Sequence, residues 1–293
     1  MPDRPTVLTP EAASGRPPVA TGRVAVTRIG HATVLLDFGG YRLLTDPWFS
    51  ERWGYYHGEP YGLTLAELPR LDGVLVSHDH YDHFDLASFR HYPDRGVPLL
   101  LKRGLATKAR AAGFGNVREL DAWEAATLGP LTITAAPGKH LVPEITFVLQ
   151  GLGLSVYFGA DTLLIPELRQ VARRFPRIDL ALVPVNGLQL RPMFNRQVVM
   201  NAREAAELCA LLRPRVAVPI HYAFTGGPIH DRLVLKYTGT AEEFARQAAR
   251  RAPGTTVRIL APGEPLLVAA SPLAGPSDAG RDAAVSGGEQ GQA

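Results

Sequence analysis

Short apolar runs separated by turn-forming residues fill the first half of the chain and predict strands. Three of them, at residues 24–29, 32–38 and 41–45, come first, and Gly39 with Gly40 supplies a tight hairpin turn between the last two. Further strands are predicted at 73–77, 98–101, 117–120, 131–136, 145–150 and 155–158, and helices at 85–90 and 104–112. The first half is therefore mainly β-structure.

The second half alternates between helical and strand patterns. Asn201 and Thr240 stand at the N-cap positions of two predicted helices. Many strands with helices between them predict an α/β (α+β) protein in which two packed sheets are covered by helices, a four-layer αββα sandwich. The predicted helices are 165–174, 201–212 and 240–251, and the strands that follow them are 180–183, 216–219 and 257–260.

The two ends of the chain differ in composition from the part between them. Residues 1–22 are rich in Pro, Ala, Ser and Thr, and residues 271–293 in Gly, Ser, Ala, Asp and Gln, without any periodicity. Both ends are predicted to be disordered tails. No second linker and no repeat interrupts residues 23–270, so we expect them to form one domain.

Composition and charge exclude several classes of protein. Apolar residues make up 46% of the chain and charged residues 20%, as in ordinary globular proteins, and the net charge is only +3. Because no long run of Lys or Arg is present, we expect no nucleic-acid partner. Cys209 is the sole cysteine, so no internal disulfide can form, and it is expected to pack as a small apolar residue. The sequence shows no signal peptide and no membrane-spanning segment, which predicts a cytoplasmic protein.

The segment His-Asp-His-Tyr-Asp-His at residues 78–83 directly follows an apolar run, where a buried strand ends. Side chains two residues apart on an extended chain point the same way, so His78 and His80 can reach one metal ion. The chain then turns toward a helix, and this turn can aim Asp82 and His83 at a second ion. Imidazole and carboxylate are ligands that zinc takes readily, so the segment predicts a metal site.

This motif and its surroundings are similar to a known family. Residues 78–83 resemble the signature of the metallo-β-lactamase superfamily. Gly-His-Ala-Thr-Val-Leu-Leu-Asp at 30–37, Leu-Leu-Thr-Asp-Pro at 43–47 and Val-Leu-Val-Ser at 74–77 resemble the branch that holds ascorbate-6-phosphate lactonase and N-acylphosphatidylethanolamine phospholipase D. The resemblance covers nearly all of residues 23–265 and implies a metallo-β-lactamase sandwich with metal-dependent hydrolase activity.

The resemblance also implies three ligands farther along the chain, each matched by position. His140 would complete the set of the first metal, Asp161 would bridge the two metals, and His221 would complete the set of the second. Each of the three follows an apolar strand, and functional side chains tend to gather on loops in such places. The implied metal ligands are His78, His80, Asp82, His83, His140, Asp161 and His221.

Such a set implies two divalent metal ions, Zn²⁺ first, with Mn²⁺ or Fe²⁺ as alternatives. Two cations hold a water between them and lower its pKa toward ~7, so that a bridging hydroxide attacks a carbonyl carbon or a phosphorus. Asp161 as the bridge and Asp82 as the ligand that orients the water would be the catalytic residues. The expected reaction is hydrolysis of a lactone, ester, amide or phosphodiester bond in a small-molecule or lipid-like substrate.

The chain departs from the family pattern at two places. The phospholipase-like members carry a histidine just before the helix that here begins at Asn201, and the matching position is about Val199. A histidine that helps to position the substrate is therefore missing, which disfavours phospholipase activity. The second departure is small, since Ala160 stands directly before Asp161 where the family often has glycine.

Four further residues are candidates for orienting the ligands or binding the substrate. Asp46 ends a strand and either orients an imidazole or forms the turn ahead of Pro47. His31 either lines the floor of the site or is a core histidine. Arg191 and Arg196 either bind a carboxylate or phosphate of the substrate or are ordinary surface residues.

Residues 48–61 are rich in aromatic side chains. Such density suits a lid or wall that contacts an organic substrate. Packing in the core or between the subunits of a homo-oligomer explains it about as well, so both interpretations stay open.

Two other functions compete with the hydrolase. A di-iron oxidoreductase on the same fold usually carries Glu at the position of His80, so this histidine and the lack of an appended flavin domain argue against it. A metal-free binding or regulatory protein is the other alternative, and the complete set of ligands argues against that.

Overall fold

The computed structural model describes residues 6–8 and 22–270 of the chain. Three residues of the predicted N-terminal tail form strand β1 (Thr6–Leu8). The predicted disorder is therefore wrong for residues 6–8, and apart from Gly22 the rest of both predicted tails lies outside the described residues, so the disorder there and the boundaries of the single domain stay predictions. Among the helices of the described part, none is long and apolar enough to cross a membrane.

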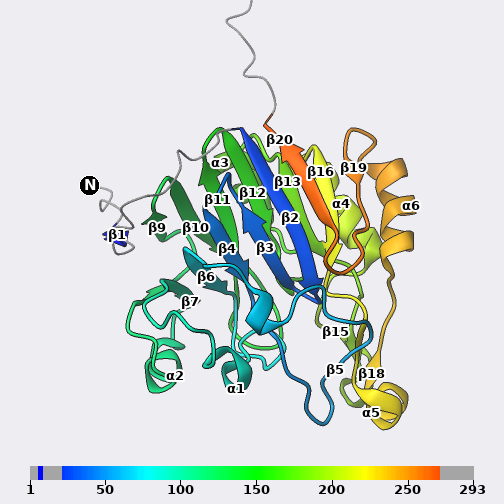
Figure 1. Ribbon diagram of the computed structural model, residues 1–293. Coiled ribbons are helices and arrows are strands. Elements are labelled where there is room, and N and C mark those ends of the chain that lie inside the picture. The colour runs from blue at the N-terminus through cyan, green and yellow to red at the C-terminus, as the bar shows by residue number, and fades with distance from the viewer. Residues whose placement is uncertain (1–5, 9–21, 271–293) are drawn as a thin grey trace, which may run out of the picture.

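Two β-sheets lie face to face at the centre of the molecule, with β2 and β3 in front of β11 and β12 in Figure 1. The first sheet has seven strands in the order β20 (Pro265–Ala269), β2 (Arg23–Gly30), β3 (Thr33–Asp37), β4 (Arg42–Thr45), β6 (Gly73–Val76), β7 (Leu99–Lys102) and β8 (Val117–Leu120). The second has eight strands in the order β1, β9 (Ala125–Leu128), β10 (Leu131–Pro137), β11 (Ile145–Gly151), β12 (Leu154–Phe158), β13 (Leu180–Pro184), β16 (Val216–Ile220) and β19 (Thr256–Val257).

Helices cover the outer faces of both sheets. One apolar cluster packs α1 (Leu86–Phe89) and α2 (Ala106–Ala111) against the first sheet. A second cluster packs α3 (Leu168–Arg174), α4 (Ala202–Leu212) and α6 (Ala241–Arg251) against the other sheet. A third fills the space between the sheets. The predicted αββα sandwich is therefore confirmed.

Local sequence signals explain why several elements begin and turn where they do. Gly39 and Gly40 have φ angles of +64° and +99°, which the tight turn between β3 and β4 requires and other residues rarely adopt. Asn201 caps α4 by accepting hydrogen bonds from the backbone N–H groups of Arg203 and Glu204. Both signals were visible in the sequence.

Short elements beyond the two large sheets surround one end of the sandwich. Strands β14 (Gln189–Leu190), β15 (Arg196–Gln197) and β18 (Leu235–Lys236) form a small sheet, and β5 (Tyr56–His57) pairs with β17 (Phe224–Thr225). Helix α5 (Gly227–Leu233) lies beside β18 at the lower end in Figure 1. Two 3₁₀ helices complete the described elements, η1 (Leu65–Glu67) and η2 (Arg191–Met193).

Candidate metal centre

The seven predicted ligands lie on loops that follow strands of both sheets. Residues 78–83 follow β6, His140 follows β10, Asp161 follows β12 and His221 follows β16. Strands β12, β13 and β16 run parallel, so their carboxyl ends meet at the same edge of the sheet. The fold therefore brings together side chains that are distant in the sequence.

Three imidazoles, those of His78, His80 and His140, converge on one point, and we call them the histidine trio. His78 Nε2 lies 3.0 Å from His80 Nδ1, and His140 Nε2 lies 3.1 Å from the same atom. Asp161 Oδ2 lies 3.8 Å from Nε2 of His78 and 3.7 Å from Nε2 of His140. These four residues can each offer one atom to a common ion.

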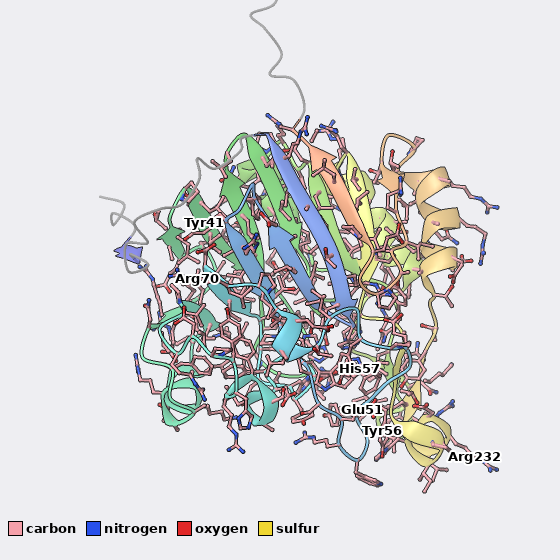
Figure 2. The ribbon with its side chains drawn as sticks, in the orientation of Figure 1. Tyr41, Glu51, Tyr56, His57, Arg70 and Arg232 are labelled. Atoms are coloured by element: carbon pink, nitrogen blue, oxygen red, sulfur yellow. The ribbon has the colours of Figure 1, made fainter. Side chains whose placement is uncertain are left out.

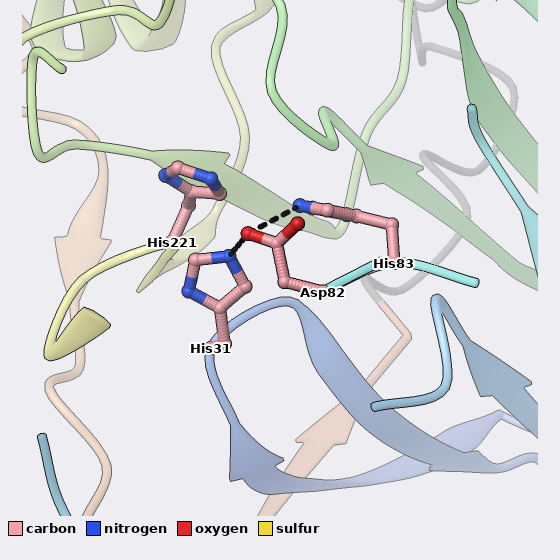
Figure 3. A group of neighbouring side chains, drawn as sticks. All are labelled: His31, Asp82, His83 and His221. Carbon is pink, nitrogen blue, oxygen red and sulfur yellow. Dashed lines mark ion pairs between the residues drawn. The ribbon is translucent and has the colours of Figure 1, made fainter. Parts of the chain in front are cut away.

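A second cluster consists of His31, Asp82, His83 and His221 (Figure 3). His83 Nε2 lies 3.9 Å from Asp82 Oδ2 and 3.2 Å from Asp161 Oδ1. His221 Nε2 lies 2.8 Å from Asp161 Oδ2. Asp161 thus contacts both the trio and the second cluster, which is the position expected of a shared ligand.

Hydrogen bonds from the outer ring nitrogens hold several of these imidazoles in place. His83 Nδ1 donates to Asp46 Oδ2 at 2.8 Å, and Asp46 also accepts from the backbone N–H and the hydroxyl of Ser77. His78 Nδ1 donates to the Ser77 hydroxyl at 2.8 Å, and His140 Nδ1 donates to a backbone carbonyl at 2.7 Å. Such bonds fix the ring orientation and leave the other nitrogen free for a metal. The structure places Asp46 where the sequence analysis expected an orienting residue.

Glu144 is a buried residue of this region that sequence reasoning missed. Its Oε1 accepts a hydrogen bond from the backbone N–H of Asp161 at 2.7 Å, and the same oxygen lies 3.6 Å from His78 Nδ1. Burial and the nearby Asp161 raise the pKa of Glu144 well above its usual range. A single glutamate ahead of an apolar strand gives no periodic or motif signal, so the sequence alone did not distinguish it.

Burial and neighbouring charges set the protonation of the site. Burial lowers the pKa of His140 to about 4, so this ring is neutral, as a metal ligand must be. Burial opposes ionisation of Asp161, yet His221 and His83 hold its pKa well below the usual range. Burial likewise opposes a charged His83, but Asp161 and Asp82 raise its pKa well above the usual value. A divalent cation here would displace the His83 proton and take over its role of neutralising the carboxylates.

The donor set fits divalent cations. Nε2 of His31 and His83 and Oδ1 of Asp82 and Asp161 are buried without a hydrogen-bond partner, although buried polar groups are rarely left so. The nitrogen separations of 3.0 and 3.1 Å in the trio are close to the ~3.3 Å between two ligands of a tetrahedral zinc ion. Both observations are accounted for if cations lie between these atoms.

A cavity of about 430 Å³ opens over the two groups of ligands. His80, Asp82 and Asp161 are among its lining residues, so a molecule in the cavity faces the candidate centre. Arg52 is the only arginine or lysine in the lining. The walls are mainly aromatic and aliphatic, with Trp53, Tyr55, Leu141, Leu188, Leu190, Val198, Phe224, Val234 and Leu235.

The aromatic loop at 48–61 divides into a buried part and a wall. Trp48 is fully buried and stacks on His57, with ring centroids 3.5 Å apart. Trp53 and Tyr55 line the cavity, and Trp53 is 73% exposed. Figure 2 shows His57 of this loop near the end of the molecule that carries α5. Core packing therefore accounts for Trp48, whereas Trp53 and Tyr55 form part of the cavity wall.

Arg191 and Arg196, the predicted substrate-binding arginines, are not among the residues that line the cavity. The Arg191 guanidinium donates through Nε to the backbone carbonyl of Leu235 at 2.9 Å, and both arginines are exposed. The positive charge at the cavity comes instead from Arg52, which lies over the Tyr81 ring at 3.8 Å.

Comparison with known proteins gives a family and several relatives. Residues 41–222 match the profile of a β-lactamase superfamily domain. A metal-dependent hydrolase of Deinococcus radiodurans is 30% identical over 251 residues, which cover 82% of this chain and 97% of that protein. An N-acyl-phosphatidylethanolamine-hydrolyzing phospholipase D of Caenorhabditis elegans is 29% identical over 224 residues, 67% of this chain and 63% of that protein.

Another relative is longer than this chain. An uncharacterized protein of Mycobacterium tuberculosis is 32% identical over 183 residues, 56% of this chain and 49% of that protein, so the match spans about half of its length. Among solved structures, a metallo hydrolase from the archaeon Ignicoccus hospitalis superimposes with a TM-score of 0.66 at 22% identity, over 84% of this chain and 98% of that one. This likeness and the family profile confirm the predicted fold.

Proposed function

The chain belongs to the β-lactamase superfamily, and from this premise we propose that it is a metal-dependent hydrolase with a binuclear centre. The bond that it cleaves is a lactone, ester, amide or phosphodiester of a small molecule or lipid. One observation carries the proposal: His78, His140 and His221, from three distant loops, meet around Asp161 with their ring nitrogens turned inward. The predicted cytoplasmic location and the single domain at 23–270 belong to the same proposal.

The residues divide the work between the two ions. The histidine trio would hold the first ion, Asp82, His83 and His221 would hold the other, and Asp161 would be shared. When bound, the cations would polarise the scissile bond and lower the pKa of a water molecule. Asp82 faces the cavity and lies beside both His31 and His83, so its carboxylate can orient a water toward a substrate. Asp46 and Ser77 keep His83 and His78 in the orientation that serves the metals.

We propose zinc as the metal because of the donor set. The two groups offer mainly imidazole nitrogen, which suits zinc, whereas Mg²⁺ and Mn²⁺ prefer sites built from carboxylate, carbonyl and water oxygens. A di-iron centre is disfavoured by the same nitrogen-rich set, in which His80 stands 3.0 Å from His78. Mn²⁺ and Fe²⁺ remain the alternatives that metal analysis would test.

The shape of the cavity supports a substrate with an apolar part. Walls of leucine and aromatic side chains favour an acyl chain or ring, while the ligands at the floor face the bond to be cleaved. The phospholipase relative is named for a lipid substrate, which supports the lipid-like choice. At Val199, where phospholipase-like members carry a histidine, this chain has a buried apolar residue, so we place esters and lactones ahead of that phospholipid.

Metal removal and reloading test the proposed function. Chelated protein is expected to lose activity on a panel of acyl lactones, p-nitrophenyl esters and bis-p-nitrophenyl phosphate, and two equivalents of Zn²⁺ per chain are expected to restore it. Hydrolysis of the panel with zinc supports the proposal. Activity that needs iron and a reductant would favour the oxidoreductase, and full activity in the chelated protein would contradict any metal-dependent mechanism.

A further inference from the structure

We propose that His31 is a protein ligand of the second cation, so that this ion is held by His31 in addition to Asp82, His83 and His221. The inference rests on the proposed binuclear centre and assigns a role that the seven-ligand pattern does not include. Figure 3 shows the His31 ring beside the Asp82 carboxylate and below His221.

Apart from the ion-pair contact with Asp82, the buried His31 ring has no polar partner. Its side chain is 1% exposed, and neither Nδ1 nor Nε2 has a hydrogen-bond partner. A buried ring with two unbonded nitrogens is costly, and core histidines usually bond at least one of them. The same condition holds for Nε2 of His83, which is one of the seven implied ligands.

His31 and Asp82 lie at ion-pair distance but without the geometry of a full hydrogen bond. His31 Nε2 lies 3.2 Å from Asp82 Oδ2, and yet Nε2 has no hydrogen-bond partner. A nitrogen and an oxygen at this separation can both be ligands of one metal ion. In a tetrahedral zinc site, the expected distance between two ligand atoms is ~3.3 Å. One donor atom from each member of the second cluster lies within 4.8 Å of the others, so His31 is within reach of a common ion.

The backbone couples His31 to an implied ligand. The backbone N–H of His221 donates to the His31 carbonyl at 3.1 Å, and the two rings lie 4.1 Å apart. Both residues have positive φ angles, +51° at His31 and +53° at His221. Residues other than glycine rarely adopt such angles. Strained conformations of this kind persist where the surroundings hold them, and functional sites are a common place for them. Two strained loops are thus joined with both imidazoles directed at one place.

Aromatic neighbours alone do not explain a histidine here. Trp48 and Phe224 flank the His31 ring, with centroids 5.2 and 5.5 Å away. Phenylalanine would fill the same space between them without burying two polar atoms. A neutral imidazole offers a metal the nitrogen lone pair that phenylalanine lacks.

The test is His31→Phe, which keeps the aromatic packing and removes the donor nitrogen. Metal-free protein is titrated with Co²⁺, and the affinity of each equivalent and its visible absorption are recorded. We expect two equivalents in the wild type. In the variant, the first equivalent of Co²⁺ should bind with unchanged affinity, and the second should bind at least ~100-fold more weakly and show an altered absorption spectrum. The loss should be this large because removing even a residue that only orients a metal ligand lowers metal affinity by about 10–100-fold. His57→Phe is the matched control, since His57 also packs against Trp48 but does not line the cavity.

A second variant, His31→Gln, keeps a polar side chain and replaces His31→Phe in the test if the latter fails to fold. We expect the same selective loss of affinity for the second equivalent of Co²⁺. The unfolding temperature of metal-free His31→Phe should be no lower than that of the metal-free wild type, because the loss of one contact with Asp82 is offset by removing two buried ring nitrogens that have no hydrogen-bond partner. Wild-type affinity and spectrum for the second equivalent in either folded variant would overturn the inference, even if activity fell. The proposed function fails separately, if the wild type binds no metal or hydrolyses nothing on the panel.

Discussion

Asp82→Ala is expected to abolish turnover while the protein still folds. Asp82 is 7% exposed, faces the cavity and has one carboxylate oxygen without a hydrogen-bond partner. It is the carboxylate that can both bind the second ion and orient the water, so its loss removes two functions at once. We expect kcat/KM to fall at least ~10⁴-fold, about 5 kcal/mol of transition-state stabilisation. The measurement is steady-state hydrolysis of the best substrate of the panel with excess zinc.

The control for Asp82 comes from the same loop. Asp79 lies three residues earlier, has an exposed side chain and forms an ion pair with Lys108. Asp79→Ala should keep kcat/KM within about threefold of the wild type, since surface ion pairs contribute little. Near wild-type activity of Asp82→Ala would eliminate the proposed role of that carboxylate.

Asp46→Ala is expected to weaken the second metal site and to destabilise the fold. Asp46 is fully buried and accepts three hydrogen bonds, from the His83 ring and from the backbone and hydroxyl of Ser77. Without Asp46 the His83 ring loses its orientation. Zinc affinity at the second site should then fall by roughly 10–100-fold, which is the usual effect of removing a hydrogen-bond partner of a metal ligand. The orphaned donors should cost about 3 kcal/mol of unfolding free energy. Zinc competition titration and urea unfolding of the metal-free protein measure the two effects.

Asp85 offers a matched control for Asp46. It is also fully buried and accepts several hydrogen bonds, from Phe49, Ser50 and Ser88, but none from an imidazole. Asp85→Ala should destabilise the fold by a comparable amount and leave zinc affinity unchanged. Equal losses of zinc affinity in both variants would mean that Asp46 acts through general stability and not through His83.

Elements with strong local patterns were predictable from the sequence. Alternating or continuous apolar runs marked nearly every strand of the central sheets, and caps such as Asn201 marked helix starts. Strand β9 was not predicted, because Ala125–Leu128 has little β-propensity. It pairs with β10 through a turn at Gly129. Strand β20 begins with Pro265 and lies at the edge of its sheet beside β2, a position where proline is tolerated but gives no strand signal.

For the candidate site, too, residues in a local motif were predictable from the sequence and residues that depend on tertiary contacts were not. The segment at 78–83 is local, so its spacing alone predicted a metal site, and the family resemblance supplied His140, Asp161 and His221. Residues that matter only through tertiary contact were invisible: nothing near Glu144 in the sequence indicates that it bonds the Asp161 backbone. Arg191 and Arg196 do not line the cavity, and the sequence could not indicate this because the charge of a loop residue does not tell which cavity the loop lines; their role in substrate binding stays a prediction.

Anomalous diffraction at the zinc edge, from crystals of the zinc-loaded protein, tests the central claim most directly. The account predicts two peaks about 3.5–4 Å apart, one within the histidine trio and one within the second cluster, with Asp161 reaching both. A single peak, peaks elsewhere in the molecule, or rings of the trio turned away from the metal would contradict it.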